Sequence, residues 1–292
     1  MFDGFTERRI TTAGAEIDLL HAGSGPPLLL LHGYPQTRAM WHLVAPRLAE
    51  RFTVVCPDLR GYGRSSKPPG DPEHLAYSKR ASAQDQVEVM AALGFSSFGV
   101  AGHDRGGRVA HRMALDHPGR VRRLAVIDIA PTREIFRAVD QATATAMYHW
   151  FFLIQPEPFP ETLIGHDPEW FVRWHLRRWS GGRDDFFARE ALADYLAAFS
   201  DPLTIHASCE DYRAAASIDL AHDDEDPDAR VGCPVLALWG ERWARGDLGA
   251  MWETRVADLE RVALSCGHFV PEEAPDETVA HLDRFFGAML SR

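Results

Sequence analysis

Short runs of apolar residues alternate with amphipathic stretches along roughly the first 130 residues of the chain. Four runs are almost wholly apolar and are followed within two residues by glycine or proline: residues 28–31, 52–56, 98–101 and 124–129. Such runs are typical of strands buried on both faces of a parallel sheet. The stretches between them, residues 41–49, 82–93 and 105–115, have the apolar spacing of helices. This alternation predicts an α/β fold with a mostly parallel central sheet flanked by helices.

The pattern changes between residues 132 and 228. This segment is rich in Trp, Phe, His and Arg, its apolar positions have helical spacing, and no clean strand pattern is visible. Buried-strand patterns return at residues 234–240 and 261–264, and a final amphipathic helix is predicted over residues 277–290. We therefore expect one core domain formed by residues 1–131 and 229–292. A helical cap domain, residues 132–228, is expected to be inserted into it.

A strand, a sharp turn and a helix are predicted around Gly102-His103-Asp104-Arg105-Gly106. This is the context of a nucleophile elbow, G-x-S-x-G, with aspartate in the place of serine. Asp104 could instead be only the N-cap of the helix. A cap needs the aspartate alone, whereas a strained turn also needs small residues on both sides, because it brings backbone segments close together. The two glycines therefore favour Asp104 as a nucleophile.

Aspartate at an elbow indicates a particular chemistry. A serine that attacks a saturated carbon leaves an ether, which water and histidine do not open. A carboxylate that attacks a saturated carbon leaves an ester on the protein, which water can hydrolyse. We therefore expect displacement at a carbon–halogen bond or an epoxide. The backbone N–H groups of Tyr34 and Arg105 are expected to form an oxyanion hole for hydrolysis of that ester.

Two arginines, Arg105 and Arg108, occupy the first turn of the predicted helix, where the helix dipole disfavours cations. They can face the same pocket as Asp104, and their charges would keep its carboxylate ionised. Two guanidinium groups can bind a carboxylate by paired, charge-assisted hydrogen bonds. Arg112 and Arg120 fit solvated positions or salt bridges to the acidic insert better. The pattern therefore predicts a substrate that carries a carboxylate.

The histidine expected of such a site is His268, which follows the last predicted strand and precedes the final helix. The chain order of nucleophile, acid and histidine places the acid between Asp104 and His268. Two candidates remain. Asp128 lies inside the predicted strand 124–129, and Glu241 follows the strand 234–240. The position of Asp128 beside the start of the insert favours it.

The composition excludes several classes of protein. Lys and Arg total 31 and Asp and Glu total 42 among the 292 residues, and a net charge of −11 argues against binding of nucleic acid. No run of 18 apolar residues is available to cross a membrane, and no secretion signal is visible, so we expect a cytoplasmic protein. The four cysteines lack a C-x-x-C spacing, so neither a zinc nor a redox motif is predicted. No metal or organic cofactor is expected.

These motifs resemble those of the α/β-hydrolase superfamily and, within it, of the fluoroacetate (haloacetate) dehalogenases. Besides the elbow, the resemblance rests on Tyr148-His149-Trp150 and Glu210-Asp211-Tyr212-Arg213 in the insert, and matching segments span most of the chain. The resemblance implies a homodimer and the following roles: Asp104 as nucleophile, Asp128 and His268 as the rest of a triad, Arg105 and Arg108 as a carboxylate clamp, His149, Trp150 and Tyr212 as a halide pocket, and Trp179 as a further lining residue.

The resemblance implies hydrolytic dehalogenation of haloacetates such as fluoroacetate and chloroacetate. The products would be glycolate and halide, formed through a covalent aspartyl ester. Two alternatives remain. The same nucleophile would open an epoxide if Tyr148, Tyr195 or Tyr212 donated a proton to the epoxide oxygen. The chain could also be a non-enzymatic protein that binds a small carboxylate. In each case the expected partner is a small molecule rather than a nucleic acid or a membrane.

Overall fold

An eight-stranded sheet lies at the centre of the computed structural model, which describes residues 1–244 and 246–290. β1 pairs antiparallel with β2, and β2 with β4, whereas all other neighbouring strands are parallel. β5 and β7 are buried along their whole length, as the apolar runs predict. From one edge to the other the strands are β1 (Thr6–Thr11), β2 (Glu16–Ala22), β4 (Thr53–Pro57), β3 (Pro27–Leu31), β5 (Phe98–His103), β6 (Val121–Ile127), β7 (Val235–Gly240) and β8 (Leu259–Leu264).

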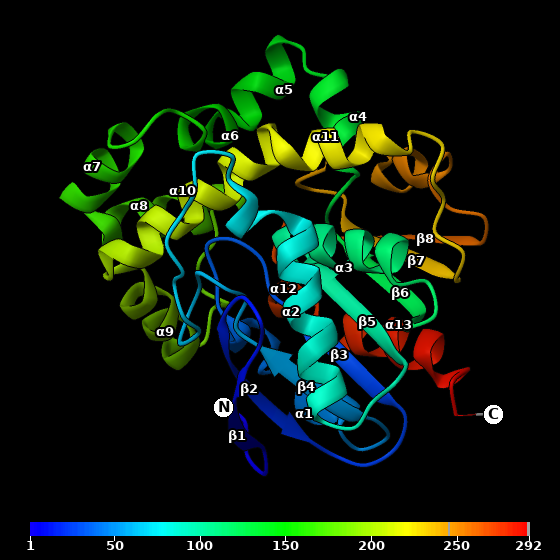
Figure 1. Cartoon of the computed structure of the whole chain (residues 1–292). Coiled ribbons are helices and arrows are strands. Elements are labelled where there is room, and N and C mark those ends of the chain that lie inside the picture. Colours follow the sequence, from blue (N-terminus) through cyan, green and yellow to red (C-terminus); the bar gives the residue numbers. More distant parts are fainter. Residues whose placement is uncertain (245, 291–292) are drawn as a thin grey trace.

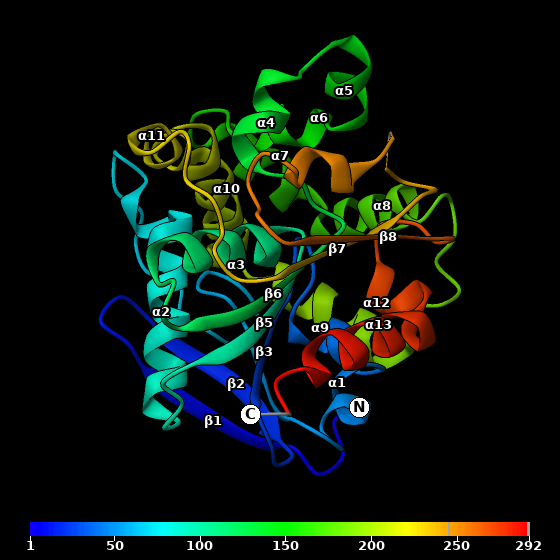
Figure 2. The same ribbon diagram turned by 90° about the vertical axis from the view of Figure 1, so that its right-hand side faces the viewer.

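Helices cover both faces of the sheet (Figures 1 and 2). One face carries α2 (Lys79–Ala92) and α3 (Arg105–Asp116). The other carries α1 (Ala45–Leu48), α12 (Val270–Glu273) and α13 (Pro275–Gly287). Three short 3₁₀ helices lie in the connections: η1 (Arg38–Trp41), η2 (Leu75–Tyr77) and η3 (Leu248–Trp252).

Eight helices separate β6 from β7, and no strand occurs among residues 132–225, all of which the structure describes. We call this segment the helical insert. Figures 1 and 2 show it as a layer at one end of the sheet. No helix in the described part of the chain combines the length and apolar character needed to cross a membrane. The insert comprises α4 (Thr132–Arg137), α5 (Gln141–Ala146), α6 (Tyr148–Leu153), α7 (Phe159–His166), α8 (Pro168–Trp179), α9 (Arg189–Phe199), α10 (Pro202–Ala216) and α11 (Ile218–Glu225).

The structure differs from the sequence-based expectation at the edge of the sheet, in the first predicted helix and at the end of β6. The edge strands β1 and β2 are not predicted, because β1 exposes five of its six residues and so lacks an apolar run. The helix predicted over residues 41–49 is split into η1 and α1, with a proline in the first turn of α1. The strand predicted over residues 124–129 ends at Ile127. Asp128 therefore lies beyond the strand, where a φ of +50° takes it out of the pleat.

The turn between β5 and α3 is sharp because Asp104 has a φ of +48° and a ψ of −114°. L residues rarely adopt this region. Glycines leave room for it: a Cβ atom on Gly102 would lie 2.3 Å from the Gly106 carbonyl oxygen, and one on Gly106 would lie 2.4 Å from the His32 carbonyl oxygen. The Asp104 side chain makes no capping hydrogen bond to α3, so the N-cap interpretation is wrong.

Replacing Gly106 with alanine is expected to lower the free energy of unfolding by about 1–3 kcal/mol, because the new methyl group overlaps backbone rather than a flexible side chain. Gly119→Ala is a matched control, since nothing lies within 4 Å of a Cβ atom there. Urea unfolding followed by tryptophan fluorescence measures both variants. Equal unfolding midpoints would contradict the steric account of the elbow.

Candidate active site

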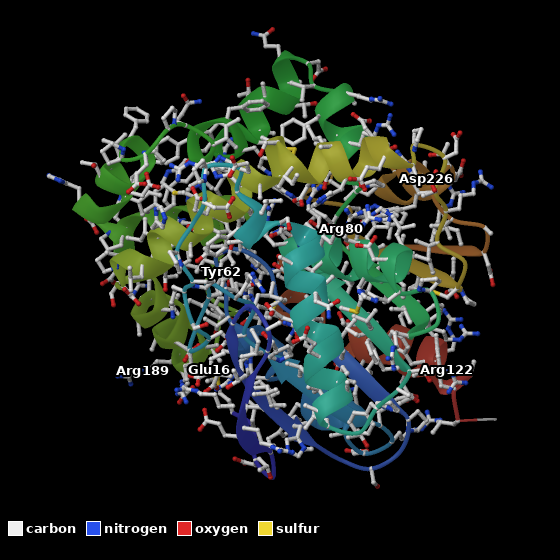
Figure 3. All side chains as sticks on the ribbon, in the orientation of Figure 1. Glu16, Tyr62, Arg80, Arg122, Arg189 and Asp226 are labelled. Carbon is white, nitrogen blue, oxygen red and sulfur yellow. The ribbon has the colours of Figure 1, made fainter. Side chains whose placement is uncertain are left out.

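Three predicted residues follow parallel strands in one half of the sheet. Asp104 comes directly after β5, Asp128 directly after β6, and His268 four residues after β8. The carboxyl ends of parallel strands meet at one edge of the sheet, which is where ligands bind in α/β folds. Side chains fill the space between this edge and the insert (Figure 3). A cavity of about 40 Å³ remains, lined by Asp104, Asp128, Ile129, Met147, His149, Trp150, Trp179, Trp243 and His268.

Asp128 and His268 form a buried hydrogen-bonded pair. His268 Nδ1 lies 2.5 Å from Asp128 Oδ2, and the Gly240 N–H donates to Asp128 Oδ1 over 2.9 Å. Burial lowers the pKa of His268, but the hydrogen bond and the charge of Asp128 outweigh burial and raise this pKa above its ordinary value. The other acidic candidate, Glu241, is exposed and does not line the cavity. The geometry therefore brings Asp128, and not Glu241, to His268.

Asp104 is buried beside this pair, and the N–H of Tyr34 donates to its Oδ1 over 3.0 Å. Burial raises the pKa of Asp104, but the charges of His268 and Arg105 outweigh burial and leave the pKa below its ordinary value. Asp104 is therefore ionised near neutral pH. Of the two backbone groups expected at an oxyanion hole, only the Tyr34 N–H bonds to Asp104 within the described residues.

His103, which the sequence analysis does not single out, holds the loop that carries His268. Its Nε2 donates to the His268 carbonyl over 2.8 Å, and burial lowers the pKa of His103 to about 3, so its ring is neutral. The His268 N–H in turn donates to the Trp179 carbonyl of the insert over 3.1 Å. The position of His103 inside the elbow motif is the one sequence signal that could have marked it.

Arg105 is buried, and a residue of the insert accepts hydrogen bonds from two of its three nitrogen atoms. Its Nε donates to Asp211 Oδ2 and its Nη2 to the Asp211 carbonyl, each over 2.7 Å. Its guanidinium carbon lies 4.1 Å from the centre of the Tyr212 ring, and its Nη1 has no hydrogen-bond partner among the described residues. Asp211 belongs to the motif at residues 210–213, but a carboxylate within a helix gives no sign of which arginine it binds. The sequence alone therefore indicates no role for Asp211.

Arg108 is also buried, and no carboxylate among the described residues pairs with it. Its Nη1 donates to Thr132 Oγ1, and its guanidinium carbon lies 4.5 Å from the centre of the Trp150 ring. Its Nε and Nη2 have no hydrogen-bond partner within the described part of the chain. Burial and the charge of Arg105 lower the pKa of Arg108 to about 10. A buried cation that lacks a bonded counter-charge is costly, and an anionic ligand would remove this cost.

One residue of the predicted halide pocket, His149, and the predicted lining residue Trp179 have buried polar atoms without partners among the described residues. His149 Nδ1 and Trp179 Nε1 make no hydrogen bond in the described part of the chain. The His149 ring centre lies 4.6 Å from that of Trp179 and 5.9 Å from that of Tyr212. The Trp150 and Tyr212 rings are 6.3 Å apart. Burial lowers the pKa of His149 well below its ordinary value, so the ring is neutral. Because buried polar atoms are normally hydrogen-bonded, this cluster indicates a ligand site.

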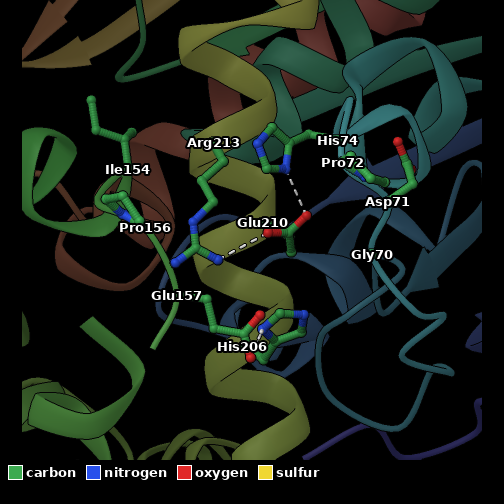
Figure 4. A pocket seen from close by; sticks show the side chains of 10 residues that line it. All are labelled: Gly70, Asp71, Pro72, His74, Ile154, Pro156, Glu157, His206, Glu210 and Arg213. Atoms are coloured by element: carbon green, nitrogen blue, oxygen red, sulfur yellow. Dashed lines mark hydrogen bonds and ion pairs between the residues drawn. The ribbon is translucent and has the colours of Figure 1, made fainter. Parts of the chain in front are cut away.

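One larger space adjoins this cavity, and another lies apart from it. One of about 220 Å³ shares Asp128, Ile129, Met147 and Trp243 with it and has a mostly apolar described lining. Another of about 460 Å³ lies between the insert and residues 70–74 and contains none of the predicted site residues (Figure 4). The described residues contain no group of three or more His, Cys, Asp or Glu that could hold a metal ion.

Comparison with known proteins agrees with this architecture. The family model described as alpha/beta hydrolase fold matches residues 26–275. A fluoroacetate dehalogenase of Burkholderia sp is 48% identical over 98% of this chain and 95% of its own length. A soluble epoxide hydrolase of Corynebacterium sp. (strain C12) is 34% identical over 97% of this chain and 98% of its own length.

A solved structure is similar over nearly the whole chain. It is a variant, with bound MFA, of a Pseudomonas aeruginosa protein assigned as an epoxide hydrolase. It superimposes with a TM-score of 0.93 and is 46% identical, covering 99% of this chain and 98% of that chain. The eight-stranded sheet, the family match and these relatives together establish that the chain belongs to the α/β hydrolase family.

Proposed function

We propose that this protein hydrolyses haloacetates to glycolate and halide through an ester on Asp104. The observation that carries the proposal is Arg108, a buried cation with two free donors and no carboxylate partner among the described residues, one helical turn from an ionised carboxylate nucleophile. A small carboxylic acid fits this arrangement. The 48% identity to a protein named fluoroacetate dehalogenase supports it.

In the first step the free donors of Arg105 and Arg108 hold the substrate carboxylate. Asp104 attacks the α-carbon from the side opposite the halogen, so that a carbon–oxygen bond forms as the carbon–halogen bond breaks. The halide leaves with the bonding electrons. Three neutral hydrogen-bond donors would stabilise it: the ring N–H groups of His149 and Trp150 and the hydroxyl of Tyr212.

In the second step neutral His268 takes a proton from water, and the hydroxide attacks the carbonyl carbon of the Asp104 ester. The N–H of Tyr34 already faces Asp104 Oδ1 and would stabilise the oxyanion, with the N–H of Arg105 as its partner. Asp128 stabilises the protonated His268. Haloacetate and water thus give glycolate, halide and one proton, which leaves His268 at the end of the cycle.

The helical insert, together with the three residues after it, would form a cap domain of residues 132–228 that excludes bulk water from these charges. The homodimer implied by the family resemblance stays a prediction. Four large apolar side chains on three helices of the insert are exposed, which is the kind of surface that a second copy would cover: Phe159, Leu163, Trp170 and Leu203.

Epoxide hydrolysis is the second candidate, because one relative with 34% identity is named a soluble epoxide hydrolase. It needs a tyrosine that donates to the epoxide oxygen. The Tyr195 hydroxyl donates to Glu272 over 3.0 Å, and the Tyr148 hydroxyl lies 2.9 Å from His175 Nε2. Tyr212 remains, but a neutral epoxide would leave the charge of Arg108 without a partner. These contacts favour the haloacetate.

Halide release tests the proposal directly. The purified protein is expected to release fluoride from fluoroacetate and chloride from chloroacetate, measured with ion-selective electrodes, and to hydrolyse styrene oxide far more slowly. Asp104→Asn should abolish release, because the amide is not a nucleophile, whereas Asp116→Asn on the same helix should retain it. Halide release by Asp104→Asn, or faster turnover of the epoxide, would overturn the proposal.

Replacing His268 with Asn should stop the second step alone. Incubation with fluoroacetate is then expected to leave the protein heavier by one carboxymethyl group, which tandem mass spectrometry should locate on the peptide that contains Asp104. The double variant with Asp104→Asn is the control and should carry no adduct. An inactive His268→Asn protein of unchanged mass would contradict a covalent intermediate.

Arg108→Met should reduce kcat/KM for chloroacetate by about 30-fold or more, because losing one partner of a buried charge pair costs about 2 kcal/mol or more. The same variant should unfold at an equal or higher temperature, since it removes an unpaired buried cation. Arg112→Met on the same helix is the control, because Arg112 pairs with Asp116 over 2.6 Å, whereas Arg108 lines the 220 Å³ space that adjoins the cavity. An unchanged kcat/KM for Arg108→Met would place the carboxylate elsewhere.

A further inference from the structure

A second buried carboxylate, Asp211 on α10, touches the site without lining the cavity. Its Oδ2 accepts from Arg105 Nε over 2.7 Å and from the Tyr62 hydroxyl over 2.9 Å, and its Oδ1 accepts from Lys79 Nζ. Tyr62, labelled in Figure 3, comes from the loop after β4, and Lys79 begins α2. Asp211 therefore connects three parts of the core to the insert through one side chain.

The contacts of Asp211 make the two arginines unequal. Two of the three nitrogen atoms of Arg105 donate to Asp211, to its side chain and to its carbonyl, and only Nη1 remains. Arg108 has two free nitrogen atoms and no carboxylate partner in the described part of the chain. The side chain of Arg105 is thus held in place, its charge is paired with Asp211, and one of its nitrogen atoms is free for a ligand. Arg108 supplies the unpaired charge.

The charges around Asp211 explain why this arrangement is firm. Burial raises the pKa of Asp211, but the charges of Arg105 and Lys79 outweigh burial and hold the pKa far below its ordinary value. Asp211 therefore stays ionised, and its hydrogen bonds to the two cations are of the strong, charge-assisted kind. The Tyr212 ring packs on the guanidinium of Arg105 from the next position of the same helix. Arg105 has little freedom to turn.

We propose that Asp211 is a positioning residue, which aims Nη1 of Arg105 at the substrate carboxylate; this inference rests on the proposed function of the site. Asp211 and Tyr212 belong to the insert, whereas Arg105, Lys79 and Tyr62 belong to the core. The carboxylate clamp is therefore complete only when α10 is docked as observed. A substrate held by Arg108 alone would bind with its α-carbon less well placed against Asp104.

Asp211→Asn tests this proposal, because it removes the charge and keeps the size. The KM for chloroacetate should rise and kcat should fall, with a loss in kcat/KM of about 10- to 100-fold, since a misplaced reacting carbon slows the displacement. The neighbouring Glu210→Gln is the matched control. Glu210 is equally buried and bonds to Arg213 over 2.9 Å and His74 over 2.8 Å, but it faces the outer pocket of Figure 4. Its kinetics should match those of the unmodified protein.

A double-mutant cycle separates positioning from a general structural role. If Asp211 acts through Arg105, then Asp211→Asn should change kcat/KM by less than about twofold in an Arg105→Gln background. Fully additive losses would overturn the proposal, as would kinetics of Asp211→Asn equal to those of Glu210→Gln. If Asp211→Asn does not fold, Asp211→Glu, which keeps the charge and displaces it by one methylene group, is expected to fold and still raise KM.

Binding of glycolate, measured by calorimetry, does not require turnover. It therefore tests the role of Asp211 independently of whether the protein hydrolyses haloacetates. Weaker binding to Asp211→Asn than to Glu210→Gln supports the positioning role even if no haloacetate is hydrolysed. Halide release by the unmodified protein together with equal glycolate binding by both variants would overturn the positioning role alone.

Discussion

The bend at Asp104 is the constraint on which the rest of the site depends. A backbone held at a φ of +48° costs about 1–3 kcal/mol and persists only where its surroundings enforce it. Here Gly102 and Gly106 let β5, α3 and the loop after β3 approach one another more closely than any side chain would allow. The bend turns the Asp104 carboxylate away from the α3 N–H groups and toward the N–H of Tyr34. One oxygen is thereby held by a hydrogen bond, and in the proposed function the other would attack the substrate.

The charges around Asp104 follow from what each neighbouring chain segment can supply. The core provides Arg105 and Arg108 from one helix. Among the described residues, the insert pairs a carboxylate, that of Asp211, with Arg105 but not with Arg108. His268 receives its carboxylate from Asp128, the residue that leaves β6 with a φ of +50°. Among the described residues the site thus has one histidine paired, one arginine paired and one arginine without a carboxylate partner. In the proposed function this difference, rather than the number of cations, favours a small anion as the ligand.

Much of the sheet could be predicted from the sequence, because its inner strands are continuous apolar runs that need no tertiary information. The exposed strand β1 could not be predicted in this way, because it is stabilised by pairing with β2 at the edge of the sheet and not by an apolar run. Asp104 and His268 were identifiable from local motifs. Asp211 and His103 were not, because their roles come from hydrogen bonds to residues 106 and 165 positions away in the chain. Spacing along a sequence carries no record of such contacts.

The balance of charge during the proposed reaction gives the two sides of the cavity different tasks. Two negative charges, on Asp104 and on the substrate carboxylate, are present before displacement, and two are present after it, on the carboxylate and on the halide. One charge stays with the arginines while the other moves across the cavity. The side that receives it offers His149, whose low pKa keeps the ring neutral. In the proposed reaction, neutral donors would therefore stabilise the departing halide without a permanent ion pair.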